Sequence, residues 1–300
     1  ARTRRPGRDP LAAHVGDRTL RRVSDGQSGA DVFRVYDEPA DFFLKIGRGT
    51  TFDLVAAEAR RLEWLAGRLP VPRVVAQACD DGAFWLLASA LPGVSAGAYI
   101  NAHRNQAVAL AEKMAEFVRR LQALPVGDCP FDSRIGAWLP VVRPLVAEGR
   151  IDTGDFDEEH YGWSAVAVLA KVEQLAHHEC GSVVVHGDFS LGNVIVDPGG
   201  EIVGCIDVGR LGVGDPYRDI FIGWRDLGGF GADAQAAFLA ALGIDYNYVS
   251  DAFDAWATII VMDVWHWTSL VALLCYAGLQ SIPQDLYEAA TLDKVSKTRQ

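Results

Sequence analysis

The stretch that decides the fold is residues 186–193, His-Gly-Asp-Phe-Ser-Leu-Gly-Asn, together with residues 206–210, Ile-Asp-Val-Gly-Arg. It contains three side chains with oxygen ligands, Asp188, Asn193 and Asp207. Phosphoryl transfer requires such a set: one carboxylate orients the attacking hydroxyl, while an amide and a second carboxylate hold Mg²⁺ on the nucleotide phosphates. The pattern therefore indicates a nucleotide-dependent kinase.

Two short strands, predicted at 194–196 and 202–206, separate these side chains and are joined by the turn sequence Asp-Pro-Gly-Gly at 197–200. Such a hairpin brings the three side chains together. Taken singly, Asp188 and Asn193 also fit loop caps and Asp207 fits a turn, because Asp and Asn dominate turns. Their order, with strands before and between, favours a catalytic site.

A kinase also needs a cation at the phosphates, and Lys45 is the candidate. It lies in the apolar run 42–46, where an unpaired ammonium is costly, and Glu58 in the following helix is its expected partner. A solvent-facing strand lysine is the alternative. The segment 24–30, Ser-Asp-Gly-Gln-Ser-Gly-Ala, can cover phosphates with its backbone N–H groups, although any glycine-bearing hairpin looks similar. No GxxxxGK[ST] motif is present, which excludes a P-loop enzyme.

The order of predicted elements divides the chain into a strand-rich part and a helical part. The boundary between them is expected near residues 89–95, at Pro92-Gly93. The elements follow from the apolar periodicity. Strands are predicted at 32–35, 42–46, 84–87 and 183–185, and helices at 54–69 (with Leu54, Leu62 and Leu65 on one face), 101–124, 137–149 and 164–177.

The composition indicates a folded, acidic chain. Its 300 residues are 50% hydrophobic and 22% charged, which excludes disorder, and the formal net charge is −11. That charge disfavours nucleic acid and anionic lipid as partners and attracts cationic small molecules. Five widely spaced cysteines without a CxxC pair fit a reducing cytoplasm better than disulfides or a zinc site. Residues 1–16 do not resemble a signal peptide.

With these features the chain resembles the aminoglycoside 3′-phosphotransferases, antibiotic-resistance kinases with a protein-kinase-like fold. The resemblance extends from about residue 18 to 244. It is carried by residues 25–30, 44–45, 58–65, 71–75, 85–87, 92–93, 129–132, 157–160, 186–193 and 206–220.

The resemblance implies a two-lobed α+β fold, with a small antiparallel-sheet lobe, a mainly helical lobe and ATP between them. It places Lys45, Glu58 and the loop residues Ser28 and Gly29 at the phosphates. The adenine is expected against the backbone of Ser89, Ala90 and Leu91. Asp188 is then the catalytic base, and Asn193 and Asp207 are the magnesium ligands.

The acceptor side is indicated by charge. Residues 151–163 contain five acidic residues and no Lys or Arg, so they form either a solvated turn or a rim that attracts a polyamine sugar. In the resembled family, positions matching Asp157, Glu158, Arg210, Arg225 and Asp226 line the aminoglycoside site. This favours the second interpretation.

The C-terminus departs from the family. Its acidic tail pair would fall near Ile259-Ile260, and residues 256–280 instead lack Lys, Arg and Glu. This length could span a bilayer, but Asp263 and His266 would be costly in lipid, which makes membrane insertion the less favoured interpretation. Helices that bury Trp256, Ile260, Trp267 and Leu270 against the larger lobe are the alternative. Residues from about 255 to 293 resemble the end of a sugar-type ABC transporter permease.

Three functions remain open on the sequence alone. The first is an ATP- and Mg²⁺-dependent aminoglycoside kinase, the second a kinase for another small cationic or sugar-alcohol substrate, and the third a catalytically impaired fusion protein. The intact set of Lys45, Glu58, Asp188, Asn193 and Asp207 opposes the third. The expected organisation is a nucleotide-binding lobe (1–91), a helical catalytic and substrate lobe (92–250) and an atypical hydrophobic tail (251–300).

Overall fold

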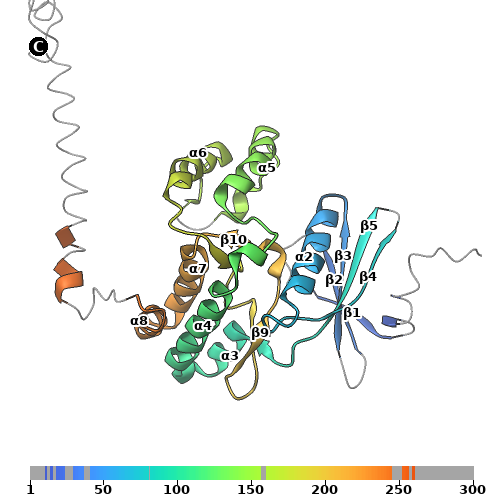
Figure 1. Cartoon of the computed structure of the whole chain (residues 1–300), viewed down its shortest axis with the longest axis horizontal. Helices are drawn as coiled ribbons and strands as arrows, with labels where there is room; N and C mark the ends of the chain where they lie inside the picture. Colours follow the sequence, from blue (N-terminus) through green and yellow to red (C-terminus); the bar gives the residue numbers. More distant parts are fainter. Residues whose placement is uncertain are drawn as a thin grey trace, which may run out of the picture. The chain divides into compact units, whose positions relative to one another are not determined.

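The chain divides into two compact units, Ala1–Ile244 and Asp245–Gln300. The computed structural model describes residues 11, 14–15, 18–23, 30–36, 41–80, 82–156, 160–244, 252–256 and 259–260. Every strand and every helix discussed below up to α8 belongs to the first unit (Figure 1).

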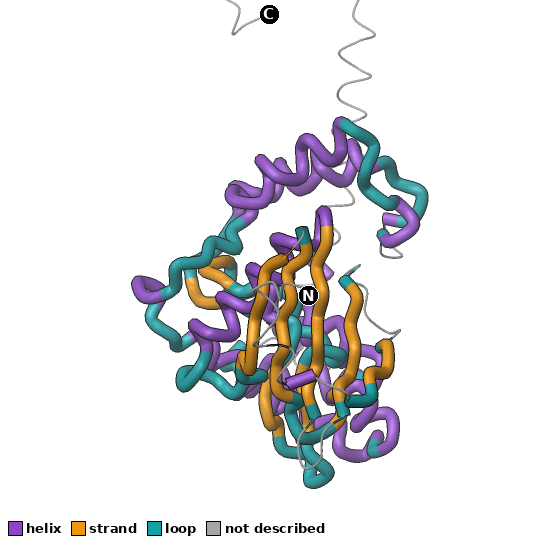
Figure 2. Tube along the Cα trace, turned by 90° about the vertical axis from the view of Figure 1, so that its right-hand side faces the viewer, coloured by secondary structure: helices purple, strands orange, loops and turns teal. Residues whose placement is uncertain are grey.

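The strand-rich part of the first unit is a five-stranded antiparallel sheet, seen face-on in Figure 2. Its strands are β1 (Leu20–Arg22), β2 (Asp31–Val35), β3 (Phe42–Arg48), β4 (Val74–Asp80) and β5 (Ala83–Ser89), in the order β1-β2-β3-β5-β4. The predicted strands at 32–35, 42–46 and 84–87 are confirmed as β2, β3 and β5. β1 and β4 were not predicted, because their sequences, Leu-Arg-Arg and Val-Val-Ala-Gln-Ala-Cys-Asp, lack a sustained alternation of apolar and polar residues.

Helix α2 (Phe52–Leu65) packs on this sheet against β3 and β5. Its buried side is formed by Val55, Glu58, Ala59, Leu62 and Leu65. The predicted face that included Leu54 is wrong, since Leu54 is 57% exposed. The helix ends at Leu65 rather than 69. The buried side of α2 thus includes an acidic residue, Glu58. Apolar periodicity alone does not predict a buried glutamate.

The helical part is built around α4, whose apolar residues recur at three and four positions and are buried along its length. Its helices are α3 (Ala96–Ala102), α4 (Ala107–Gln122), α5 (Ile135–Ala147), α6 (Ala165–Leu175), α7 (Tyr217–Leu227) and α8 (Ala232–Ala241). The predicted helix over 101–124 is divided at His103, which closes α3. The predictions at 137–149 and 164–177 are confirmed to within two residues as α5 and α6, while α7 and α8 were not predicted.

Short strands connect the functional segments of this part. β6 (Val94–Ser95), β8 (Val194–Val196) and β9 (Ile202–Cys205) form one small sheet, and β7 (Val183–Val185) pairs with β10 (Gly212–Gly214). The β8–β9 turn forms as predicted: Asp197 Oδ1 accepts the N–H groups of Gly199 and Glu201 at 2.8 and 2.9 Å. The hairpin therefore holds Asn193 at its start and Asp207 just after its end.

The second unit is described only at 252–256 and 259–260, which are helical. Trp256 and Ile260 are 65% and 55% exposed. Burial of the tail against the larger lobe stays a prediction. Trp267, Leu270 and most of the apolar run 256–280 lie outside the described residues. Among the helices that are described, none is both long and apolar enough to cross a membrane.

Candidate active site

The centre of the site is an ion-paired cluster of three side chains from β3, α2 and the segment after β9. Lys45 Nζ lies 2.7 and 2.9 Å from the two carboxylate oxygens of Glu58 and 2.5 Å from Asp207 Oδ1. Burial by itself would lower the pKa of Lys45, but the two carboxylates outweigh it and raise that pKa. The lysine is therefore held as a cation, and the predicted Lys45–Glu58 pair is confirmed in its geometry.

The segment 186–188 is held by a residue that the sequence analysis did not identify, Asp219 on α7. Asp219 is fully buried, and its carboxylate accepts the backbone N–H of His186 at 2.6 Å and of Gly187 at 2.9 Å. The ring of His186 is buried as well, and its Nε2 lies 2.9 Å from the carbonyl oxygen of Ile206. These contacts join the Asp188 segment to the Asp207 segment.

Gly187 is required by two features of its position. Its φ is +82°, which L side chains rarely adopt, and a Cβ there would lie 2.6 Å from the carbonyl oxygen of Arg210. The backbone before Asp188 therefore packs directly on the segment that follows Asp207.

Asp188 and Asn193 lie at the two ends of one tight turn. The Asp188 carbonyl accepts the backbone N–H of Ser190 at 2.8 Å and Asn193 Nδ2 at 2.9 Å. The amide nitrogen of Asn193 is thus used within the protein, and its Oδ1 remains available to a cation. Within the described part of the chain, the Asp188 carboxylate accepts no hydrogen bond, so it is available to an acceptor hydroxyl.

Asp207 has φ +59° and is the one non-glycine residue with a positive φ among those the structure describes. Asp is one of the few residue types that tolerate this conformation. Its side chain is 47% exposed. Burial by itself would raise the pKa of Asp207, but Lys45 outweighs it and lowers that pKa. The Ile206 N–H donates to the Asn193 carbonyl at 2.9 Å, which joins the two segments. An ionised, accessible carboxylate and the unused amide oxygen of Asn193 are hard oxygen donors of the kind that Mg²⁺ prefers.

The predicted adenine segment follows β5. The Ser89 N–H donates to the Arg73 carbonyl and the Ala90 N–H to the Asp41 carbonyl, each at 2.9 Å. In the described part of the chain the N–H of Leu91 makes no hydrogen bond, which leaves it for a ligand. Ser28 and Gly29, predicted to cover the phosphates, lie outside the described residues.

The predicted acceptor residues are only partly described, since Asp157 and Glu158 lie outside the described residues. Arg225 and Asp226 are at the end of α7 and contact each other at 3.1 Å. Asp226 Oδ2 also accepts the N–H of Leu191 at 3.1 Å. Asp226 therefore holds the turn between Asp188 and Asn193, a contact that the sequence analysis did not foresee.

Helix α2 is fixed to the helical lobe by Arg61, a second contact that sequence reasoning missed. Arg61 Nε donates to the Leu211 carbonyl at 2.7 Å, and its guanidinium lies 4.6 Å from the ring centre of Phe131. Because Glu58 is one helical turn away on α2, this contact holds the Glu58–Lys45 pair in place. The sequence signal was an Arg within an otherwise amphipathic helix, which is too common to single out.

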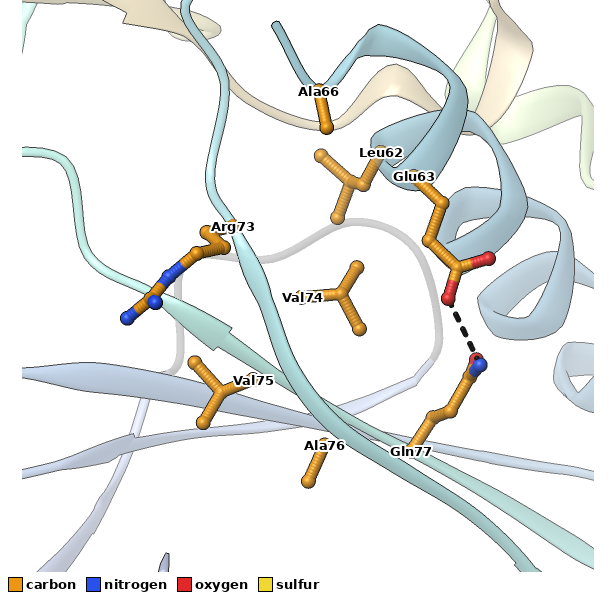
Figure 3. Close-up of a pocket in the computed structure, with 8 residues that line it drawn as sticks. All are labelled: Leu62, Glu63, Ala66, Arg73, Val74, Val75, Ala76 and Gln77. Carbon is orange, nitrogen blue, oxygen red and sulfur yellow. Dashed lines mark hydrogen bonds between the residues drawn. The ribbon is translucent and has the colours of Figure 1, made fainter.

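A hollow of about 370 Å³ lies away from these residues, between the C-terminal end of α2 and β4 (Figure 3). It is lined by Leu62, Glu63, Ala66 and residues 73–77, and Gln77 Nε2 donates to Glu63 Oε1 at 3.0 Å on one side of it. None of the predicted site residues lines it. It is separate from the candidate active site.

The chain is similar in sequence to known phosphotransferases. The model of the phosphotransferase enzyme family matches residues 19–257, and the chain belongs to that family. It is 38% identical over 224 residues to an aminoglycoside 3′-phosphotransferase of Escherichia coli (73% of this chain, 82% of the relative) and 42% identical over 231 residues to one of Streptomyces fradiae (71% and 85%).

Solved structures show the same similarity. An aminoglycoside-3′-phosphotransferase of type VIII superposes with a TM-score of 0.68 at 35% identity, covering 78% of this chain and 90% of that one. Aminoglycoside phosphotransferase APH(3″)-Id from Streptomyces rimosus, in complex with ADP and streptomycin, gives a TM-score of 0.66 at 30% identity (79% and 91%). The predicted two-lobed, kinase-like α+β fold is confirmed.

The tail has a different similarity. The model of the binding-protein-dependent transport system inner membrane component matches residues 224–300, overlapping the end of the phosphotransferase match. Similarity of the tail to a transport component, expected from the sequence, is thus found. Most of the matched residues after 244 lie outside the described ones.

Proposed function

We propose that this chain is an aminoglycoside O-phosphotransferase that transfers the terminal phosphoryl group of ATP to a hydroxyl of the antibiotic and so confers resistance. The observation that carries the proposal is the bridging of Glu58 and Asp207 by Lys45, with the free carboxylate of Asp188 on the adjoining turn. Membership of the family and the named functions of relatives at 38–42% identity support the choice of acceptor.

Each side chain has a role in this proposal. Lys45, positioned by Glu58, contacts the phosphates, and the backbone of Ser89, Ala90 and Leu91 receives the adenine, with Ser28 and Gly29 covering the phosphates. Asn193 and Asp207 would hold Mg²⁺, which neutralises phosphate charge when bound. Asp188 accepts the proton of the acceptor hydroxyl and orients that hydroxyl for attack.

The acceptor is a small cationic aminosugar, which the net charge of −11 attracts. Asp157, Glu158, Arg210, Arg225 and Asp226 are proposed to line its site. The same charge disfavours nucleic acid as a partner. We also propose that residues 1–91 bind the nucleotide and that residues 92–250 carry catalysis and the acceptor. For the tail, we propose a likeness to a sugar-type ABC transporter permease end over about 255–293. We propose that the protein works in the cytoplasm.

One observation favours a second acceptor class. The family's acidic tail pair would fall near Ile259 and Ile260, which are apolar and each 55% exposed. Loss of two carboxylates weakens the attraction for amines. A kinase for another small cationic or sugar-alcohol substrate is therefore the alternative.

The test is release of ADP by the purified full chain with MgATP and a panel of aminoglycosides, choline and simple sugars. We expect turnover with aminoglycosides, and loss of at least about 10²-fold in Asp188→Asn with ATP binding retained. Turnover confined to choline or a sugar would establish the alternative. Near-normal turnover by Asp188→Asn would remove the assigned base.

A further inference from the structure

Lys45 uses each of its hydrogen-bond donors within the protein. An ammonium group has three N–H donors. Lys45 Nζ lies 2.7 and 2.9 Å from the two carboxylate oxygens of Glu58 and 2.5 Å from Oδ1 of Asp207, which makes three contacts for three donors. The lysine can therefore donate to a phosphate oxygen only after one of these contacts breaks.

The two partners of Lys45 differ in how firmly they are held. The side chain of Glu58 is 10% exposed, and both of its oxygens contact the lysine. The side chain of Asp207 is 47% exposed, and one of its oxygens contacts the lysine. Within the described part of the chain, Lys45 is the one hydrogen-bond donor to the Asp207 carboxylate. Asp207 is therefore the partner that leaves when a phosphate binds.

The backbone around Asp207 does not have to move for this exchange. On one side, the Ile206 N–H donates to the Asn193 carbonyl at 2.9 Å. On the other side, a Cβ at Gly209 would lie 3.9 Å from the Cβ of Glu58, so the turn after Asp207 packs on α2. Because the chain is held on both sides, rotation of the Asp207 side chain to another rotamer is enough to free the lysine donor.

The contact acts against a phosphate that carries no metal ion. Such a phosphate has to displace the Asp207 carboxylate from Lys45, and the two anions then repel each other at short range. An Asp207 carboxylate that binds Mg²⁺ has a cation of its own, and it leaves the lysine donor to the phosphate. Metal binding by Asp207 and phosphate binding by Lys45 therefore favour each other.

We infer that Asp207 makes the site selective for metal-bound nucleotide, because without a metal ion it occupies the Lys45 donor that a phosphate needs. This role is separate from metal binding, since it acts on nucleotide that carries no metal. It keeps metal-free ATP from occupying the site without reaction. The inference rests on the proposed function for the nucleotide and the metal ligands, and it does not depend on the acceptor.

The test is isothermal titration calorimetry of the full chain with ATP, in EDTA and in Mg²⁺. Asp207→Gly removes the side chain, and glycine adopts the φ of +59° without strain. In EDTA this variant should bind ATP about ten-fold or more tighter than the wild type, the scale of one hydrogen bond to a charged group. In Mg²⁺ it should bind ATP more weakly, because a metal ligand is lost. Asp207→Asn keeps an oxygen that accepts from Lys45 and should gain about three-fold in EDTA.

Three controls separate this role from general repulsion of a phosphate. Asp188→Asn removes a site carboxylate that makes no ion pair with Lys45 in the described part of the chain. It should change the Kd for ATP in EDTA by less than about two-fold, because repulsion without direct contact is screened by salt. In a Lys45→Met background, which has no donor to free, Asp207→Gly should gain no more than Asp188→Asn does. Adenosine, which has no phosphate, should bind the wild type and Asp207→Gly alike.

The inference is overturned if Asp207→Gly binds ATP in EDTA no more tightly than the wild type, or if its full gain persists in the Lys45→Met background. A wild type that binds ATP equally well with and without Mg²⁺ would also overturn it. Melting temperatures show which variants are folded, and Asp207→Asn with wild-type affinity in EDTA decides against the inference if Asp207→Gly does not fold. A chain with the expected binding pattern that phosphorylates no aminoglycoside would overturn the proposed function and leave the inference standing.

Discussion

Asp219 is predicted to be the main anchor of the segment that carries the catalytic aspartate. Its carboxylate accepts two backbone N–H groups, at 2.6 and 2.9 Å, in a site without solvent exposure. Asp219→Ala leaves both donors buried and unpaired, at about 1–3 kcal/mol each. Taking about 2 kcal/mol per donor, the variant should lose about 4 kcal/mol, a large part of the roughly 5–15 kcal/mol that stabilises a domain.

Thermal unfolding measures this loss. At about 2–4 °C per kcal/mol for a domain of this size, Asp219→Ala should lower Tm by roughly 8–16 °C. Asp219→Asn should lose about half as much, because its amide oxygen still accepts one N–H group while its NH₂ group faces the other donor. ADP release should fall in both variants, since the backbone before Asp188 is no longer held.

The control is Asp233→Ala, an exposed residue in the first turn of α8, which should cost well under about 1 kcal/mol. The reasoning is refuted if Asp219→Ala melts within about 1 °C of the wild type in this comparison. Two buried N–H groups without acceptors should lower the free energy of unfolding by more than such a small shift allows.

Three further predictions follow from the site. Gly187→Ala should lower both Tm and turnover, because a Cβ would lie 2.6 Å from the Arg210 carbonyl at φ +82°; Gly127→Ala, where a Cβ meets no atom within 4 Å, is the control, and equal melting of the two variants would contradict the prediction. Lys45 lowers the pKa of Asp207 in the native state. Above about pH 4, the pKa of this carboxyl in the unfolded chain, its ionised form stabilises the native state. This contribution disappears as the pH falls through the native pKa. Tm should therefore fall more steeply between about pH 5 and 3 in the wild type than in Asp207→Asn, and parallel curves would disprove it. Asp157→Asn with Glu158→Gln should raise KM for a cationic acceptor at low salt and leave KM for ATP unchanged; an unaltered acceptor KM would assign both residues to a solvated turn.

The local elements near the site could largely be predicted because they are governed by neighbours in the chain. The turn at 197–200 depends on Asp197 and two glycines, and β7 and β8 are runs of β-branched residues with the predicted bounds. Strand β1 and helix α8 could not be predicted in this way. β1 exists because it pairs with β2, and the sequence of α8 has almost no amphipathic pattern despite its buried Ala234 and Phe238.

The sequence by itself determined which residues to propose for the chemistry: Lys45, Glu58, Asp188, Asn193 and Asp207 are recognisable by residue type and order. Phosphoryl transfer needs a cation, a base and hard oxygen ligands whatever surrounds them. Only the tertiary structure decided what holds those groups in place. Asp219, Arg61 and Asp226 act on backbone groups 32 to 150 residues away in the chain, and any backbone N–H or carbonyl can be such a partner. A contact with the backbone leaves no mark on the partner's residue type, so folding alone reveals it.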